Sequence, residues 1–342
     1  MPTLYLTTPG TRAHLVSQHL EIETPATAST DPTESRQDQP LIRRIPLHEI
    51  EQVVVETTTS LTIYALATFA ERGVPVVLVR PSGQAVALCL PPAPDLPTRL
   101  AHYQSRLLPD FPLSVARVLI EAKIANSRRL LQRLAANRSQ PAPPAVDQLE
   151  PVRVATLRAT SVESCRGYEG TAAGTYFTAL AAYFPAHAPF ERRSRRPPHN
   201  PANALLSFGY SLLTHETTTA LHAAGLDPAL GYLHEPETGR PSLALDLIEP
   251  FRAAVSDGLA LDLFNHATLQ PKTHFQPHDG GIYLNPDGRR RYYTAYERRM
   301  DRPFTSELTG QRTTLRDEIR RQLYSLKRLL LGQGGFEPFI MN

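Results

Sequence analysis

The chain has 342 residues, 41% of them hydrophobic and 20% charged, which is the composition of a globular protein that can bury a full core. Its net charge of +3 is too small to demonstrate a nucleic-acid partner, and two cysteines, Cys89 and Cys165, support neither a disulfide framework nor a thiolate zinc site. Neither a signal-peptide pattern nor an apolar run of bilayer length is evident. We therefore expect a cytoplasmic protein of one large domain or two ordinary ones.

Residues 1–90 predict a small β-rich domain, a β-sandwich or mixed sheet that holds one helix. Short apolar runs typical of strands occur at 4–7, 13–16, 19–22, 41–46, 52–56, 74–79 and 85–90. The helix is expected over 60–73, where Ser60 supplies a cap and Gly73 a stop.

Two segments interrupt this pattern. Residues 24–40 lose their apolar side chains and fill with Thr, Pro, Ser, Asp and Gln, which predicts a mobile hairpin insertion. Residues 91–97 contain four prolines in seven positions, which predicts a semi-rigid linker and a domain boundary.

From residue 98 to residue 342 the apolar period changes to about 3.6, so we expect a larger all-α domain and an α+β fold class overall. Gly167 is predicted to mark a local break, residues 264–300 to be irregular, and residues 332–342 to form a short mobile tail. A hairpin with interleaved Tyr and Arg is expected around 283–293. The predicted helices span 98–108, 113–136, 146–159, 204–224 and 312–331. The polar surface of the second is predicted to carry Arg117, Lys123, Arg128, Arg129 and Arg133.

Arginine gathers in runs, at 192–196, 289–291 and 298–299. The planar guanidinium fork suits phosphate better than the point charge of lysine does, so these runs are compatible with a DNA backbone. The alternative is that arginine supplies ordinary solvated positive faces, and for any single run the two interpretations stay open.

The stretch 231–252 holds the strongest group of chemically active residues. His234 lies on a turn, and a short apolar run after it carries Asp246 and Glu249, which share one face if that run is helical. One imidazole and two carboxylates can bind a hard or borderline divalent metal. Whether Asp246 is itself a ligand or supports one stays open.

Glu169 is a further candidate, because on a helix it shares a face with the small residues Ala172 and Ala173. Small neighbours allow another backbone to approach an acid closely. The alternative is an exposed glutamate in a first helical turn, favoured by the helix dipole.

Several motifs in order resemble those of the CRISPR-associated integrase of the Cas-one family. They include Ile45-Pro-Leu-His-Glu-Ile-Glu-Gln-Val-Val-Val, Gly167-Tyr-Glu-Gly-Thr-Ala-Ala-Gly-Thr-Tyr-Phe, Gly231-Tyr-Leu-His and Leu243-Ala-Leu-Asp-Leu-Ile-Glu-Pro-Phe-Arg. A bare Glu, His and Glu set would be a weak signal, whereas all of these motifs at these spacings are far more specific.

The resemblance implies a β-rich dimerisation domain, a helical catalytic domain, a homodimer and a small bridging partner of the Cas-two family. It places metal ligands at Glu169, His234 and Glu249, with Asp246 as a supporting acid. This oxygen-rich set with one nitrogen suits Mg²⁺ or Mn²⁺. Residues expected to contact DNA are Arg192, Arg193, Arg195, Arg196, Arg252, Arg289, Arg290 and Arg291.

The implied activity is metal-dependent phosphoryl transfer, in which the 3′-hydroxyl ends of short DNA fragments are joined to a CRISPR repeat array. Endonuclease side activity is expected when water replaces the hydroxyl. Two alternatives are a stand-alone metal nuclease acting on branched or repair DNA, and a DNA-binding scaffold without catalysis.

Overall fold

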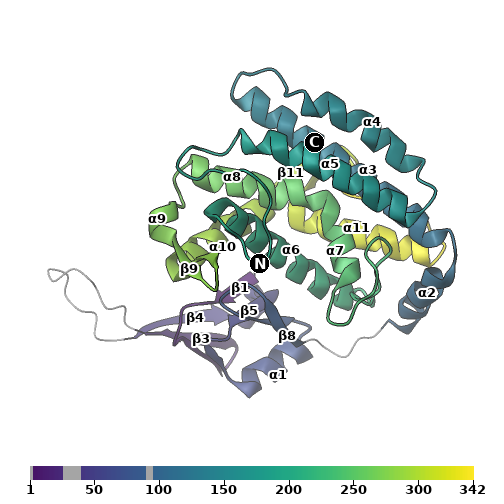
Figure 1. Cartoon of the computed structure of the whole chain (residues 1–342). Helices are drawn as coiled ribbons and strands as arrows, with labels where there is room; N and C mark the ends of the chain where they lie inside the picture. The colour runs from purple at the N-terminus through teal and green to yellow at the C-terminus, as the bar shows by residue number, and fades with distance from the viewer. Residues whose placement is uncertain (1–2, 26–39, 90–94) are drawn as a thin grey trace. The chain divides into compact units, whose positions relative to one another are not determined.

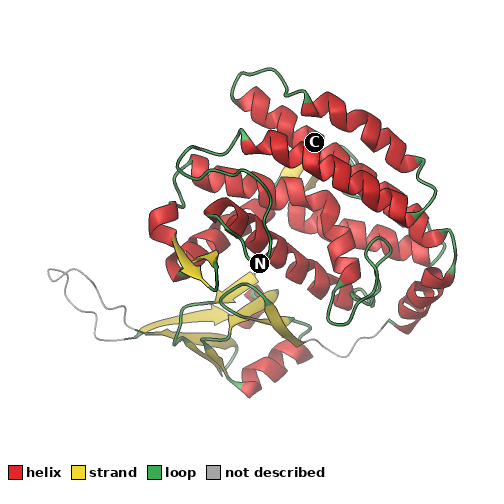
Figure 2. Cartoon of the chain, in the orientation of Figure 1, coloured by secondary structure: helices red, strands yellow, loops and turns green. Residues whose placement is uncertain are grey.

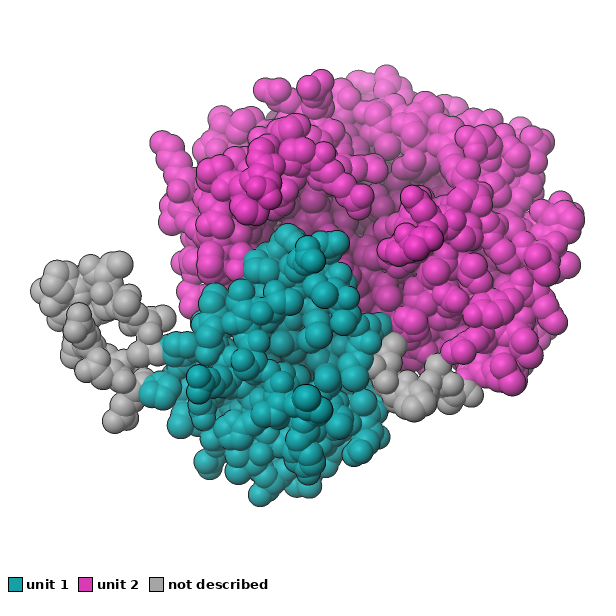
Figure 3. Space-filling model, turned by 60° about the horizontal axis from the view of Figure 1, so that its bottom comes forward, with its two compact units in different colours: residues 1–93 teal, residues 94–342 magenta. Residues whose placement is uncertain are grey.

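The computed structural model describes residues 3–25, 40–89 and 95–342. Most of the expected insertion at 24–40 and part of the expected linker at 91–97 lie outside the described residues. The chain divides into two compact units, Met1–Ala93 and Pro94–Asn342 (Figure 3). Strands dominate the first unit and helices the second, which confirms the predicted fold class (Figure 2).

Two four-stranded sheets build the first unit. In one sheet three neighbouring strands run parallel and the last pairs antiparallel, in the order β1 (Thr3–Leu6), β5 (Gln52–Glu56), β7 (Val76–Val79), β8 (Ala85–Cys89). The other sheet has the order β4 (Leu41–Pro46), β3 (His19–Thr24), β2 (Arg12–Val16), β6 (Ser60–Leu61).

A single apolar core joins both sheets to helix α1 (Ile63–Glu71). Val53 and Val76 from the first sheet and Leu20 from the second are each fully buried, and Phe69 of α1 belongs to the same cluster. The helix starts later than predicted, because Ser60 is in strand β6 and the cap is Thr62, whose Oγ1 accepts from the amide of Ala65 at 3.3 Å.

Ten helices of the described residues 95–342 form most of the second unit (Figure 1). They are α2 (Leu96–Leu107), α3 (Phe111–Asn137), α4 (Ala145–Leu157), α5 (Val162–Ala181), α6 (Pro201–Ala223), α7 (Ser242–Ile248), α8 (Gly258–Asn265), α9 (Pro271–His274), α10 (Pro286–Met300) and α11 (Leu315–Leu330). None of the helices found in the described part of the chain is long and apolar enough to cross a membrane.

Helix α5 contradicts the predicted break at Gly167, because the helix continues through this residue to Ala181. It begins after Ser161, whose Oγ accepts from the amide of Ser164 at 3.1 Å. A glycine inside a helix costs about 1 kcal/mol relative to alanine. Packing of α5 against both α3 and α4 offsets this cost.

Residues 264–300 are ordered rather than irregular. They form the end of α8, helix α9, the hairpin of β9 (Phe275–His278) and β10 (Gly281–Leu284), and helix α10. Asn285 caps α10 by accepting from the amide of Gly288 at 2.9 Å, with Pro286 at the first helical position. The predicted Tyr and Arg hairpin at 283–293 is therefore wrong.

The stretch after α7 departs from regular helix where the acids lie. Glu249–Phe251 forms a 3₁₀ turn and Ala253–Asp257 a π-helical turn before α8 begins. Pro250 has no amide hydrogen to donate and disfavours α-helix at the residue before it, which accounts for the change at this point.

Candidate active site

His234 is held by the buried carboxylate of Asp246. Its Nδ1 lies 2.7 Å from Asp246 Oδ1, and its own amide donates to the same oxygen at 2.9 Å. The amides of Tyr232 and Leu233 donate to Oδ2 at 2.6 and 2.9 Å. Each oxygen thus has two partners, and no part of Asp246 is exposed to solvent. Asp246 can orient His234 and leave Nε2 as the ring nitrogen available to a ligand.

The loop that carries His234 is tied to its surroundings on both sides. Ser242 at the start of α7 donates to the carbonyl of Glu235 at 2.8 Å, and Arg166 of α5 donates to the carbonyl of Leu233 at 2.9 Å. A Cβ at Gly231 would lie 2.7 Å from the carbonyl oxygen of His234 and 2.8 Å from Asp246 Oδ2. The tight turn therefore requires glycine at this position.

Lys123 of α3 brings Glu169 and Glu249 to one place. Its ammonium forms ion pairs with Glu169 Oε1 and, at 2.6 Å, with Glu249 Oε2. Glu169 is on α5 and its side chain is 28% exposed, whereas that of Glu249 is 3% exposed. The two predicted acids therefore share the charge of Lys123 at the boundary between solvent and core.

Glu249 is stabilised in its charged form despite its burial. Burial by itself raises the pKa of this carboxyl, but the positive charges of Arg252, Lys123 and His234 outweigh it and lower the pKa to about 2. The guanidinium of Arg252 lies 2.9 Å from Glu249 Oε1. It also stacks over the ring of Tyr210, 4.7 Å from the centroid.

A pocket opens beside Glu169 and is rich in positive charge. Four cationic side chains line it, together with the carboxylates of Glu169 and Asp257. The cationic residues are Lys123, Arg193, Arg195 and Arg252. Guanidinium and ammonium groups concentrated in this way attract phosphate.

Asp257 forms the floor of this pocket and binds two tyrosines. The hydroxyls of Tyr176 and Tyr210 donate to its two oxygens at 2.7 and 2.6 Å. Burial raises the pKa of Asp257, while these two hydrogen bonds and the nearby arginines act in the opposite direction. The network fixes the ring of Tyr210 under Arg252 and Arg193.

The predicted ligands fit a divalent cation by two observations. The Lys123 ammonium already lies between Glu169 and Glu249, so the surroundings favour a cation at that point. Glu249 Oε2 is buried 2.6 Å from the Lys123 ammonium, so a cation that displaces the ammonium would find this oxygen available to coordinate. Two carboxylates and an imidazole match the donors that Mg²⁺ and Mn²⁺ accept.

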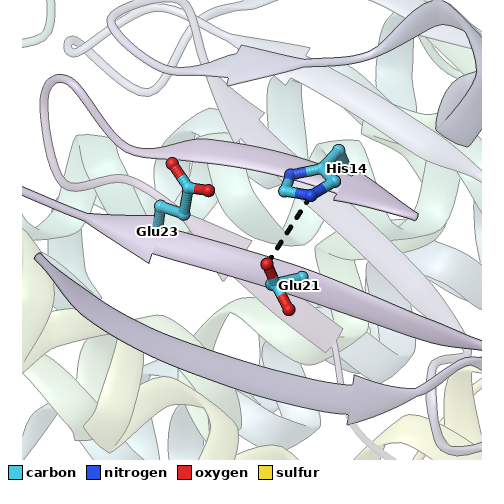
Figure 4. A group of neighbouring side chains, drawn as sticks. All are labelled: His14, Glu21 and Glu23. Atoms are coloured by element: carbon cyan, nitrogen blue, oxygen red, sulfur yellow. Dashed lines mark ion pairs between the residues drawn. The ribbon is translucent and has the colours of Figure 1, made fainter. Parts of the chain in front are cut away.

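A different group could also hold a metal ion. Within the described residues, His14, Glu21 and Glu23 on strands β2 and β3 have ligand atoms that all lie within 4.8 Å of one another (Figure 4). Glu169, His234 and Glu249 do not form such a group among those residues. Glu21, however, is already paired with Arg44 at 2.6 Å and lies 3.6 Å from His14 Nε2, so its charge is largely balanced.

The arginines expected to bind DNA differ in exposure. Arg192, Arg195 and Arg196 are exposed. Arg193 is anchored by Asn203 Oδ1 at 2.9 Å and Ser207 at 3.0 Å. Arg289 is buried within α10, contrary to the expected DNA contact. Arg290 and Arg291 are on the exposed side of the same helix and pair with Asp287 at 2.5 and 2.9 Å.

Sequence reasoning missed the role of three residues. Lys123 was expected on the polar surface of its helix, yet its side chain is only 13% exposed and points between two acids. Arg166 and Asp257 had no sequence signal beyond their charge. A helical period distinguishes polar from apolar faces, but it does not distinguish a solvated face from one that lines a site.

Comparisons with known proteins agree with this fold. The family model described as CRISPR associated protein Cas1 matches residues 4–298. CRISPR-associated endonuclease Cas1 3 of Thermus thermophilus is 35% identical over 87% of this chain and 88% of its own length. CRISPR-associated endonuclease Cas1 1 of Chlorobaculum tepidum is 34% identical over 87% of this chain and 90% of its own.

Solved structures give the same result. A casposase bound to integration product superposes with a TM-score of 0.85 at 25% identity, covering 98% of this chain and 93% of its own. A Cas1 protein from Thermotoga maritima superposes with a TM-score of 0.80 at 25% identity, covering 98% and 99%. The resemblance seen in the sequence is confirmed, and the chain belongs to the family of CRISPR-associated Cas1 proteins.

Proposed function

We propose that this chain is a divalent-metal-dependent DNA integrase that joins the 3′-hydroxyl ends of short DNA fragments to a CRISPR repeat array, with endonuclease side activity. The observation that carries the proposal is the meeting of Glu169 and Glu249 around one cation, beside a pocket lined by four cationic side chains. The names of the endonuclease relatives and of the casposase with its integration product support the same chemistry.

In this proposal Glu169, His234 and Glu249 hold Mg²⁺ or Mn²⁺. When bound, such an ion supplies Lewis-acid stabilisation of charge on phosphate oxygens. Asp246 keeps the imidazole of His234 in one orientation through Nδ1, which leaves Nε2 as the nitrogen that would bind the ion. Arg252 holds Glu249 ionised and in place.

The cationic pocket binds the phosphate that reacts. Arg195 is exposed at its rim, and Arg252 is fixed by Tyr210 below it. The 3′-oxygen of the fragment forms a bond to a phosphorus atom of the target strand, while the bond between that phosphorus and the target's own 3′-oxygen breaks. One phosphodiester therefore replaces another, and no external energy source is needed. The proton leaves the attacking hydroxyl for solvent, and the departing oxygen takes one up.

We further propose that the working protein is a homodimer bridged by a small partner of the Cas-two family, and that its substrates are double-stranded fragments with 3′ ends and repeat DNA. Family membership supports this proposal. Copurification with the partner and the measured mass of the complex test it.

A strand-transfer assay tests the activity. Purified protein, a labelled fragment and a repeat-containing plasmid are titrated with Mn²⁺ or Mg²⁺, and a fragment with dideoxy 3′ ends is the matched control. We expect joining of the hydroxyl fragment only. His234→Ala should abolish joining and leave DNA binding intact, because it removes one ligand and no pocket charge. Wild-type joining rates in His234→Ala would refute the site.

The same assay separates the alternatives. A stand-alone nuclease would cleave the plasmid and join neither fragment. A scaffold would retain the fragment on the protein but neither cleave nor join at any metal concentration.

A further inference from the structure

The last residues of the chain pack against the segment that carries Glu249. The C-terminal tail, residues 335–342, follows α11 without regular secondary structure, yet Phe339 and Met341 are buried. The ring of Phe339 stacks on that of Phe251, with centroids 4.5 Å apart and planes at 8°. The predicted mobile tail is therefore wrong for these residues. The family model matches residues 4–298, so the tail lies beyond the matched part.

Two buried amide side chains connect the tail to the backbone on either side of Glu249. Asn126 of α3 donates from Nδ2 to the carbonyl of Pro250 at 2.7 Å and to that of Phe339 at 2.9 Å. Its Oδ1 accepts from the amide of Met341 at 2.7 Å.

Gln322 of α11 does the same on the other side. It donates from Nε2 to the carbonyl of Leu247 at 2.8 Å, and its Oε1 accepts from the amide of Phe339 at 2.9 Å. Residues 247 and 250 thus flank Glu249. Each of their carbonyls accepts from a side-chain amide, and the oxygen of that same amide accepts from a backbone amide of the tail.

This arrangement matters because the backbone here is not a regular helix. The chain changes from α-helix to a 3₁₀ turn at Glu249, where Pro250 cannot donate to a preceding carbonyl. At this turn the side chains of Asn126 and Gln322 donate to the carbonyls of Pro250 and Leu247. Asn126 and Gln322 are 0% and 1% exposed, and the tail amides of Met341 and Phe339 satisfy their buried side-chain oxygens.

We propose that the C-terminal tail is a positioning element for the metal centre, which it stabilises by locking Asn126 and Gln322 onto the backbone around Glu249. The proposal rests on the proposed function, since it takes Glu249 as a ligand. Partners that orient a ligand from behind change metal affinity about 10- to 100-fold when removed. A merely structural tail would change the melting temperature and leave the affinity of the folded protein unaltered.

The test measures Mn²⁺ affinity of DNA-free protein from the electron paramagnetic resonance signal of free Mn²⁺, well below each variant's melting temperature. Gln322→Met keeps the volume of the side chain and removes both hydrogen bonds. Gln333→Met is the matched control, because it makes the same change at an exposed position next to the tail. We expect the dissociation constant to rise about tenfold in Gln322→Met and to stay at the wild-type value in Gln333→Met.

An unchanged dissociation constant in folded Gln322→Met would overturn the inference while leaving the metal centre standing. If Gln322→Met does not fold, the milder Phe339→Leu, which removes only the stack on Phe251, replaces it. A rise of about threefold is then expected, and an unchanged value overturns the inference. Wild-type protein whose Mn²⁺ affinity equals that of His234→Ala would instead overturn the proposed function, and this inference with it.

Discussion

Replacing Lys123 by methionine would remove the positive charge that forms ion pairs with both Glu169 and Glu249. Methionine has nearly the same length and no charge, so the two acids would face each other without the ammonium. Breaking a buried ion pair by removing one partner costs about 3–5 kcal/mol. Glu249 keeps Arg252 at 2.9 Å and Glu169 is partly exposed, so we expect the lower end, a loss of about 3 kcal/mol in the free energy of unfolding.

The loss should depend on metal. In wild-type protein a divalent cation must displace the Lys123 ammonium before it can bind both acids. In Lys123→Met that competition is absent, so the cation should bind more tightly. A ligand at 100 times its dissociation constant stabilises the folded state by about 2.7 kcal/mol. Mn²⁺ should therefore restore most of the stability of the variant.

The assay is urea unfolding of wild type, Lys123→Met and Lys272→Met, each with chelator and with Mn²⁺. Lys272 is an exposed lysine and makes a matched control for the substitution. The reasoning is refuted if Lys123→Met is as stable as wild type in chelator, or if Mn²⁺ stabilises both proteins by the same amount.

Two further outcomes are expected. Gly231→Ala should weaken Mn²⁺ binding about 10-fold or more and slow strand joining, because its Cβ would push away the His234 carbonyl and the Asp246 carboxylate. Gly239→Ala has no atom within 4 Å of its Cβ and controls for the added volume, although its φ is positive. Normal Mn²⁺ binding in Gly231→Ala would contradict the close approach. Burial lowers the pKa of His215 to about 4 from the ordinary value of 6.5, so between these values the unfolded chain binds more protons and the free energy of unfolding falls as the pH falls. This group accounts for about 3 kcal/mol of that fall. The free energy of unfolding of His215→Gln should therefore change less between pH 6.5 and pH 4 than that of wild type. Equal changes in the two proteins would show that His215 is not the cause.

The local sequence pattern was enough to predict those features of the structure that depend on interactions within a few residues of the chain. The period of two in residues 1–90 and the period near 3.6 afterwards predicted the fold class, because burial of one face acts on each strand and helix separately. The pairing of His234 with Asp246 is also local, since the turn folds back on α7 and the three consecutive amides of residues 232–234 donate to one carboxylate.

Tertiary packing alone decided the rest. Lys123, Glu169 and Glu249 meet only because α3 packs against α5 and against the 3₁₀ turn at Glu249. The periodicity of a sequence does not predict which polar residues on different helices will form ion pairs with the same charged side chain. For the same reason α10 was missed: its arginines and tyrosines look like a surface, yet Arg289, Tyr292 and Tyr296 are buried, and the two tyrosines contact Phe208 and Glu216 of α6.

The C-terminal tail shows the same division between sequence and structure. Its composition gave no sign of order, yet the amide groups of Asn126 and Gln322 and the stack of Phe339 on Phe251 hold it in place. The sequence by itself determined the family and the two structural classes, and it predicted the acids and the imidazole of the site. The tertiary structure decided what surrounds them, because charge balance and buried hydrogen bonds depend on contacts between distant segments, such as those of Asn126 with Pro250 and Phe339.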